Sequence, residues 1–378
     1  MRILSRLAGG RLAVAAVALA PLAISGARAQ QFVPDITISS TVPSNGDLNP
    51  YGVAFVPPNF PPGGAISPGD ILVSNFNNAA TKANPGGLQG MGTTIVMLTP
   101  EVVTPAGTAP TFFTSSAIGL TTALGVLQRG FVLVGNVPTD KTGAILQGSL
   151  QVIDRSGKQI ASFTNQLNDP WDLTIDDHFD HATVFVSNVN NNTGAQKNGT
   201  VTRLTLSISA TTVAVTSTTV IANGYTVEPN SSALVLGPTG LALDRETDTL
   251  YVASTADNAV FAVPNASTRS GPPTGTGTGM MIAQNGQLRG PLALVLAPNG
   301  NLVTSNGDAV NTDPTHPSEI VELTKTGRFV SQFNVDAATG GAFGIGISMV
   351  KDNTARLAVV DDNANDIIVI DQNVMSDQ

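Results

Sequence analysis

The sequence predicts an all-β fold, namely a six-bladed β-propeller of four-stranded antiparallel blades whose ring is closed by the N-terminal strand. Three observations predict it. A Pro-x-Gly phrase followed by three short apolar strands returns six times along the 378 residues, and an all-strand repeat of this size is typical of a ring of small sheets. The strands are rich in β-branched residues and bounded by Gly, Pro, Asn and Asp. No stretch keeps a 3.6-residue apolar period, so we expect almost no helix.

We name the predicted strands of each repeat a to d, from the centre of the ring outward. Strand a follows the phrase, which reads Asn49-Pro50-Tyr51-Gly52 in the first repeat and Asp169-Pro170-Trp171-Asp172 in the third. The second repeat departs most, because Ala123-Leu124-Gly125 replaces the phrase there. The predicted a strands are 52–55, 125–127, 172–175, 240–243, 293–296 and 344–347.

The remaining strands follow in the same order in every repeat. The b strands are 71–74, 131–134, 183–187, 249–253, 301–305 and 356–360, and the c strands are 94–98, 149–153, 200–204, 259–263, 319–323 and 366–370. The d strands are 111–113, 159–163, 213–221, 280–283 and 329–333. The sixth repeat lacks a d strand, whereas the strand at 35–39 lacks a partner. Placing it there closes the ring and removes an exposed edge, so we expect residues 30–378 to form one domain.

Residues 1–29 have the pattern of a cleavable signal peptide. Three arginines precede the apolar stretch 12–24, and Ala27-Arg28-Ala29 forms an Ala-x-Ala cleavage site. The stretch is too short for a confident membrane span, and no later apolar run is long enough to cross a bilayer. We therefore expect a bacterial protein that is periplasmic or secreted, monomeric and not inserted in a membrane.

Composition excludes several classes of function. The chain has no Cys, which excludes thiolate chemistry and Cys-ligated metals. Removing residues 1–29 takes away four Arg and no acid, so 14 Lys and Arg remain against 27 Asp and Glu, a net charge of −13. Such a balance argues against nucleic-acid partners, which need clustered positive charge. It suits hard cations or neutral ligands, and it also simply favours solubility.

Function is expected on one face of the ring. We call the face with the b–c loops and the starts of the a strands the loop face, and the face with the a–b turns the turn face. Four b–c loops are long, at 76–92, 136–148, 188–199 and 306–318. Long loops on a rigid scaffold are where binding usually resides, although insertions without a function would look the same.

Polar side chains gather on the loop face. Strand b ends in an amide or acid in five repeats, at Asn75, Asn136, Asn188, Asn306 and Asp361. Such side chains commonly cap turns. They also offer oxygen to a hard cation, so Asn49, Asp169, Asp308 and Asp361 are the candidate ligands of a Ca²⁺ site assembled from several blades.

The middle residue of each phrase, or of the three residues that stand in its place, is expected to line the channel mouth on the loop face. These residues are Tyr51, Leu124, Trp171, Thr239, Leu292 and Phe343. The chain has one Trp and three Tyr, so the pairing of Trp171 with Tyr51 suggests an aromatic platform for a sugar or another small organic ligand, ringed by the Asn side chains. The alternative is packing between blades. A partly exposed Trp171 would favour the platform, and a buried Trp171 would favour packing.

The three histidines give little support to catalysis. His178 and His181 lie in an a–b turn among acids, where they could hold a metal but are more commonly just solvated. His316 is in the fifth long loop, where a general base is conceivable. No Ser with a placed partner indicates a triad.

The fourth repeat resembles the NHL-repeat family of six-bladed propellers. Its residues 237–244 read Gly-Pro-Thr-Gly-Leu-Ala-Leu-Asp, and 250–258 supply the following strand and its terminal Asp-Asn. The resemblance covers nearly all of the chain after residue 29. Gluconolactonase-like and strictosidine-synthase-like propellers share this plan, and the lactonase type implies a divalent metal held by Glu, Asn and Asp near the starts of the a strands. Only Asn49, Asp169 and Asp172 supply oxygen there in this sequence.

Two hypotheses of different class follow. The first is an exported, non-catalytic binding or scaffold propeller without a cofactor, whose small-molecule, carbohydrate or protein partner docks on the loop face at Tyr51, Trp171 and Phe343. The second is a divalent-metal-dependent hydrolase or lactonase. It requires at least three oxygen-bearing side chains to converge near the axis, from the set Asn49, Asp169, Asn188, Asn306, Asp308 and Asp361.

Overall fold

Every described secondary-structure element is a β-strand, as the absence of a helical period predicts. The structure is a computed structural model, and it describes residues 34–140, 142–189, 196–307, 311, 313–351 and 353–374. This part of the chain contains no helix long and apolar enough to cross a membrane. The predicted signal peptide and Asp308 lie outside the described residues.

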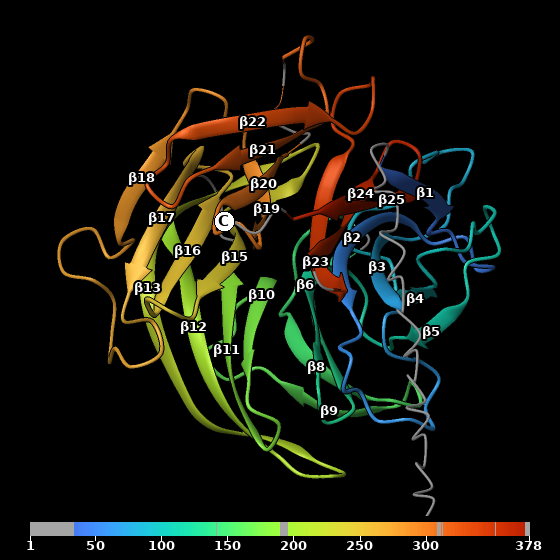
Figure 1. Cartoon of the computed structure of the whole chain (residues 1–378), viewed down its shortest axis with the longest axis horizontal. Coiled ribbons are helices and arrows are strands. Elements are labelled where there is room, and N and C mark those ends of the chain that lie inside the picture. Colours follow the sequence, from blue (N-terminus) through green and yellow to red (C-terminus); the bar gives the residue numbers. More distant parts are fainter. Residues whose placement is uncertain are drawn as a thin grey trace, which may run out of the picture. The chain divides into compact units, whose positions relative to one another are not determined.

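The strands form six antiparallel blades around an axis, which confirms the predicted six-bladed β-propeller (Figure 1). Blade 1 contains β2 (Leu48–Phe55), β3 (Ile71–Asn77), β4 (Thr94–Leu98) and β5 (Thr111–Thr114), and blade 2 contains β6 (Leu120–Leu127), β7 (Phe131–Asn136), β8 (Ser149–Asp154) and β9 (Gln159–Phe163). Blade 3 contains β10 (Pro170–Asp177), β11 (His181–Asn188), β12 (Gln196–Ile208), β13 (Val213–Asn230) and the additional β14 (Leu234–Leu236).

The other three blades have four strands each. Blade 4 contains β15 (Pro238–Asp244), β16 (Thr249–Ser254), β17 (Ala259–Pro264) and β18 (Met280–Gln284). Blade 5 contains β19 (Pro291–Leu296), β20 (Leu302–Asn306), β21 (Glu319–Leu323) and β22 (Phe329–Asn334). Blade 6 contains β23 (Ala342–Lys351), β24 (Thr354–Asp361), β25 (Asp366–Asn373) and, as its outer strand, β1 (Asp35–Ser40). β1 pairs with β25 from Asp35 opposite Asp371 to Ser40 opposite Asp366, which confirms the predicted closure.

The innermost strands begin earlier than predicted, because the Pro-x-Gly phrase lies inside the strand at a β-bulge. Pro50 pairs with Asn75 and Val53 pairs with Val73, so three steps along β2 match two along β3. The same irregularity occurs at the start of β10, β15, β19 and β23. A bulge tolerates Pro, which cannot donate to a ladder.

The prediction for the second repeat is wrong in register. Leu120, and not Ala123, pairs with the Asn that ends strand b, and Leu124 pairs with Val134. Four steps on β6 therefore match two on β7, so this bulge holds one residue more than the others. Residues 120–122, Leu-Thr-Thr, take the place of the phrase, and the sequence signal is weak because this segment has no Pro and no Gly.

The apolar core is divided among the interfaces between neighbouring blades. Leu133 and Leu150 of blade 2, for example, pack with Val184 and Leu204 of blade 3. Near the axis, hydrogen bonds also join neighbouring blades. Ser74 Oγ accepts from the Gly52 N–H (2.9 Å) and donates to the Thr121 carbonyl of the next blade (2.7 Å). This arrangement holds six strand starts close around the axis.

Blade 3 carries an extension that the sequence did not predict. β13 continues past residue 221 to Asn230, and the chain returns through β14, with Glu228 opposite Leu236 and Pro229 opposite Val235. We call residues 227–236 the cap hairpin. Its apolar side chains pack into the same cluster as Tyr51 and Trp171, so it covers the axis on the loop face.

Candidate functional site in the axial channel

Four aromatic rings close the channel on the loop face. Tyr51 stacks on Phe76 with ring centroids 5.0 Å apart, and it contacts Phe343 at 4.7 Å. Trp171 meets Tyr51 and Phe76 edge-on at 5.9 and 5.7 Å. We call these four residues the aromatic plug. Edge-on and tilted contacts are the preferred geometry of packed rings.

The expectation of an accessible aromatic mouth is wrong. Trp171 is 1% exposed, Tyr51 3% and Phe343 2%, because Val227, Leu234 and Val235 of the cap hairpin pack against the plug. Among the described residues no hydrogen-bond partner reaches the buried Trp171 Nε1. The packing alternative therefore describes these rings, and a ligand on the loop face cannot touch them in this conformation.

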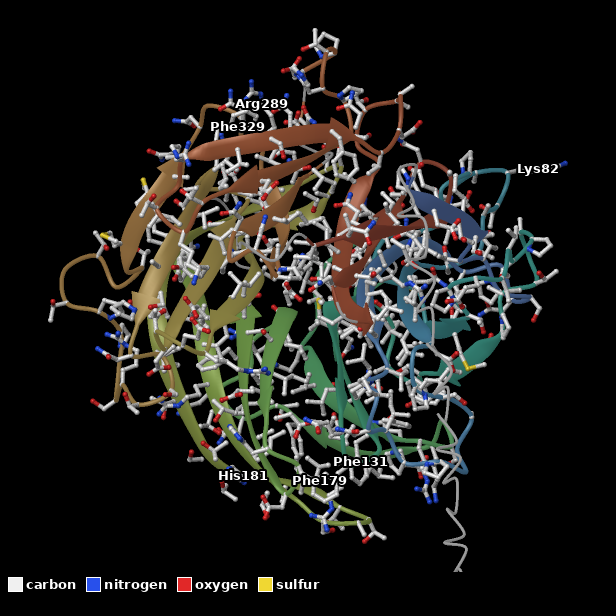
Figure 2. The ribbon with its side chains drawn as sticks, in the orientation of Figure 1. Lys82, Phe131, Phe179, His181, Arg289 and Phe329 are labelled. Atoms are coloured by element: carbon white, nitrogen blue, oxygen red, sulfur yellow. The ribbon has the colours of Figure 1, made fainter. Side chains whose placement is uncertain are left out.

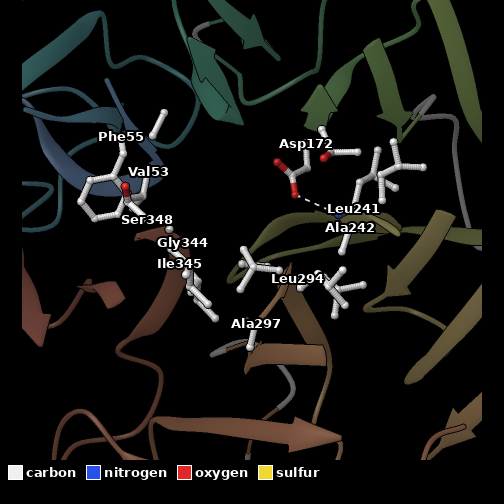
Figure 3. A pocket seen from close by; sticks show the side chains of 18 of the residues that line it. Val53, Phe55, Asp172, Leu241, Ala242, Leu294, Ala297, Gly344, Ile345 and Ser348 are labelled. Atoms are coloured by element: carbon white, nitrogen blue, oxygen red, sulfur yellow. Dashed lines mark hydrogen bonds between the residues drawn. The ribbon is translucent and has the colours of Figure 1, made fainter. Parts of the chain in front are cut away.

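Beneath the plug, the innermost strands of the blades enclose a cavity of about 830 Å³. Apolar and polar side chains share its lining, and Val53, Leu124, Leu241, Leu294 and Ile345 are among the apolar ones (Figure 3). Exposure rises toward the a–b turns along the innermost strands β10, β19 and β23. The cavity is thus closed at the loop face and open at the turn face.

Asp172 places one carboxyl group at the closed end of this cavity (Figure 3). Its Oδ1 accepts from its neighbour Leu173 N (2.8 Å), and its Oδ2 accepts from Leu241 N of blade 4 (3.1 Å). Burial raises the pKa of this carboxyl well above its ordinary value, and the two backbone bonds offset only part of that effect. The Asp172 N–H donates to Ser187 Oγ at 3.0 Å, which fixes the residue in place.

The other blades have small residues at the level of Asp172, and sterics explain why. The equivalents are Gly52, Thr122, Gly240, Ala293 and Gly344. A Cβ on Gly344 would lie 1.8 Å from the Tyr51 carbonyl oxygen, and one on Gly240 would lie 2.3 Å from Leu294 N. Neighbouring backbones therefore approach Gly344 and Gly240 too closely for a side chain. The sequence showed that Asp172 replaces a Gly, and the structure shows that this puts a carboxyl into the cavity.

Two basic side chains, Lys325 and Arg245, line the open end of the cavity, and each is paired with an acid. Lys325 Nζ lies 2.6 Å from Asp244 Oδ2, and Arg245 Nε lies 2.7 Å from Asp176 Oδ1. The bond to Asp244 raises the pKa of Lys325. Glu246 also lines the cavity. Both bases at the mouth are therefore already paired with acids.

The four predicted ligand-binding asparagines are buried and bonded within the ring. Asn136 Oδ1 accepts from Ser149 N (2.9 Å) and Ser149 Oγ (2.8 Å), and its Nδ2 donates to Ile118 O (3.0 Å). The other three make comparable bonds, Asn75 to Thr41 O, Asn188 to Thr202 Oγ1 and Asn306 to Gln287 O. Each one ties the end of strand b to neighbouring segments of the blades, as a turn-capping residue does.

The candidate metal ligands are spread over separate blades. Asn49 N donates to Asn365 Oδ1 (2.7 Å), Asp169 Oδ1 accepts from Gly148 N (3.1 Å) and Asp361 Oδ1 accepts from Asn363 N (3.1 Å). Asp308 lies outside the described residues. Within the described ranges, no three His, Asp or Glu side chains are grouped so that they could hold a metal ion. The Ca²⁺ site therefore stays a prediction, and we derive no chemistry through a metal ion.

The histidines lie away from the axial cavity. His178 and His181 stack at 5.0 Å between ring centroids, and each contacts an Asp, at 3.0 and 2.6 Å. His181 begins β11 and lies at the lower edge of the view in Figure 2. His316 Nδ1 lies 3.4 Å from Asp313 Oδ2 in the fifth b–c loop. All three side chains are substantially exposed, in line with the solvated alternative.

Comparison with known proteins supports the fold and goes no further. No protein-family model matches the chain, and no curated protein sequence matches it. Among solved structures, a gluconolactonase from Xanthomonas campestris is similar with a TM-score of 0.50 and 12% identity, covering 89% of each chain. An inactive virginiamycin B lyase from Staphylococcus aureus has a TM-score of 0.46 and 12% identity, covering 90% of this chain and all of its own. An α-L-arabinofuranosidase variant from Fusarium graminearum has a TM-score of 0.49 and 11% identity, covering 90% and 98%. At such identities the likeness shows a six-bladed β-propeller and no activity, and the NHL repeat stays a prediction.

Proposed function

We propose that this protein is an exported binding protein that takes a small organic molecule into the axial cavity from the turn face. The observation that carries the proposal is a single-ended cavity that combines apolar side chains with one buried carboxyl at its closed end. Ligand sites typically measure about 300–1,000 Å³ and combine apolar walls with a few placed polar groups. A cavity of about 830 Å³ with Asp172 fits this description.

The proposal moves the ligand from the loop face to the turn face. On the loop face the axis is blocked by buried rings and by the cap hairpin. The four asparagines there are buried, and the Nδ2 of each already donates a hydrogen bond within the ring. A partner that docks only on the long loops would have to use their outer surfaces and would not reach the axis.

A catalytic role of the same cavity is the second candidate. A buried carboxyl with a raised pKa can act as a general acid or base, and Asp172 is such a group. The fold is also that of a protein named gluconolactonase. A metal-dependent hydrolase would gain stability on adding Ca²⁺ relative to excess chelator, because a ligand of the folded state stabilises it.

Binding of the neutral, environment-sensitive dye Nile red tests the proposed function. We expect one dye per protein and enhanced fluorescence in the wild type. Ser348→Trp places a large side chain on the cavity lining near the turn face and should abolish this binding. The control Ser162→Trp lies on the outer strand β9, far from the axis, and should bind as the wild type does. Absence of dye binding, or equal binding by both variants, would contradict the proposed site.

A further inference from the structure

We infer that the axial cavity selects a molecule that carries a protonated amine on an apolar body, with the ammonium group held by Asp172. This inference rests on the proposed function and specifies its ligand class. The amine would lie at the closed end, next to the aromatic plug, and the apolar body would extend along the innermost strands toward the turn face.

The first support is the missing countercharge. Asp172 is 9% exposed, and within the described part of the chain no Lys, Arg or His forms an ion pair with it. The backbone N–H groups of Leu173 and Leu241 donate hydrogen bonds to its carboxyl oxygens. A buried carboxylate without a cation is costly. A ligand that brings the cation removes that cost.

The second support is the unused bonding capacity of the carboxylate. An ionised carboxylate has about four acceptor positions on its two oxygens. The backbone occupies one position on each oxygen of Asp172, and the carboxyl faces the cavity (Figure 3). An ammonium group has three donors and forms short, charge-assisted bonds with such oxygens.

The third support concerns which ligands the cavity disfavours. Anionic ligands would find no free cation, because the mouth residues Lys325 and Arg245 are paired with Asp244 and Asp176. The hydroxyl of Thr122, at the level of Asp172, donates to the Trp171 carbonyl. The groups that line the cavity include three acids, Asp172, Asp244 and Glu246, and two bases. Electrostatics therefore favour a cation.

The walls supply the rest of the binding free energy. Leu241, Leu294 and Ile345 lie around the cavity within reach of the space beside Asp172 (Figure 3). Removing apolar surface from water favours binding. An apolar chain of a few carbons attached to the amine would therefore bind along these residues.

Three probes with the same body test the inference by calorimetry at pH 7: 4-phenylbutylamine, 4-phenylbutanol and 4-phenylbutyrate. We expect the amine to bind at least tenfold more tightly than the alcohol and the carboxylate to bind most weakly. Asp172→Asn should remove the preference for the amine and leave the affinity for the alcohol within about twofold. Asp35→Asn, at the exposed start of the outer strand β1 and outside the cavity, is the matched control and should keep the preference.

The outcomes separate the two proposals. If the alcohol and the amine bind equally well to the wild type, the cavity binds ligands but the amine inference is overturned. Binding of none of the three probes, together with no binding of Nile red, would overturn the proposed function itself. If Asp172→Asn does not fold, Asp172→Gly replaces it, because Gly is the residue at this level in blades 1, 4 and 6. A preference for the amine that survives in either folded variant would also overturn the inference.

Discussion

Asp361, at the end of strand β24, couples stability to pH. Burial, and next the nearby Asp336 carboxylate, raise its pKa from 3.8 to about 6. The folded protein therefore binds more protons than the unfolded chain between about pH 4 and pH 6. Stability from the protonated Asp361 is complete below pH 3.8 and is lost as the pH rises through 6.

The substitution Asp361→Asn is expected to remove the loss of stability that the wild type shows as the pH rises through 6. Asn keeps an oxygen that accepts from the Asn363 N–H and carries no charge. Urea unfolding at pH 4.5 and pH 8 should show the variant gaining about 1–2 kcal/mol on the wild type at the higher pH, after allowance for solvent screening. Asp336→Asn should give part of the same gain because it removes the repulsion. An identical pH dependence in the wild type and Asp361→Asn would refute the assignment.

Residue positions were predictable from the sequence, whereas their partners were not. The amides at the ends of the b strands occupy the predicted positions, yet Asn136 bonds Ser149 and Ile118 and offers nothing to a ligand. Turn capping and ligand binding use the same side chains, so the type of residue could not separate the two roles. Asp172 was recognisable as an exception in the phrase, but its cavity depends on strands from all six blades.

The cap hairpin is the element that most changes the interpretation of the molecule. The sequence signal for it was hidden by Gly224 and Pro229, which are typical of turns. In the structure Gly224 has a φ of +84° within a strand whose register shifts near residue 223, so the strand bends and continues. Its base is held by Asp257, which accepts from the Thr226 N–H (2.9 Å) and pairs with Lys197 (2.8 Å).

The single Trp of the chain reports directly on this element. Trp171 is buried under the cap hairpin, so its emission should be blue-shifted and protected from acrylamide. Val235→Ala removes two methyl groups from the packing against the plug and should cost about 1–2 kcal/mol. It should also shift the emission to the red and raise the quenching constant.

The matched control for this prediction is Val330→Ala. Val330 is 41% exposed on the outer strand β22, so its truncation should change neither stability nor emission. If Val235→Ala and Val330→Ala have the same emission and quenching as the wild type, the hairpin does not seal the plug.

At the scale of the whole molecule, the ring could be predicted from the sequence because each repeat contains the same series of short apolar strands and turns. The count of blades, the order of strands and the closure by the N-terminal strand all follow from that pattern. The direction in which the axial cavity opens does not follow from the repeat pattern. It is decided by side chains of Tyr51, Trp171 and Phe343, which meet only after distant blades are assembled, and by the cap hairpin of a single blade.

Closure of the ring gives a last prediction. β1 is the outer strand of blade 6, and its six residues pair with β25 while Ser39 Oγ donates to the Val102 carbonyl of blade 1 (2.9 Å). A chain that starts at residue 41 loses these bonds and exposes the edge of β25. Compared with a chain that starts at residue 34, we expect it to lose about 3–5 kcal/mol in urea unfolding and to associate through the free edge.

Backbone pairing, and not the side chains of β1, should account for most of this loss. Ile36 and Ile38 are 52% and 50% exposed, so the double variant Ile36→Ser, Ile38→Ser in the chain that starts at residue 34 should lose less than about 1 kcal/mol. A peptide of residues 34–40 added to the shorter chain should restore part of the lost stability, because it can pair with β25 as β1 does. If the chain that starts at residue 41 unfolds at the same urea concentration as the longer one and stays monomeric, the ring does not depend on β1, and blade 6 is stable with three strands.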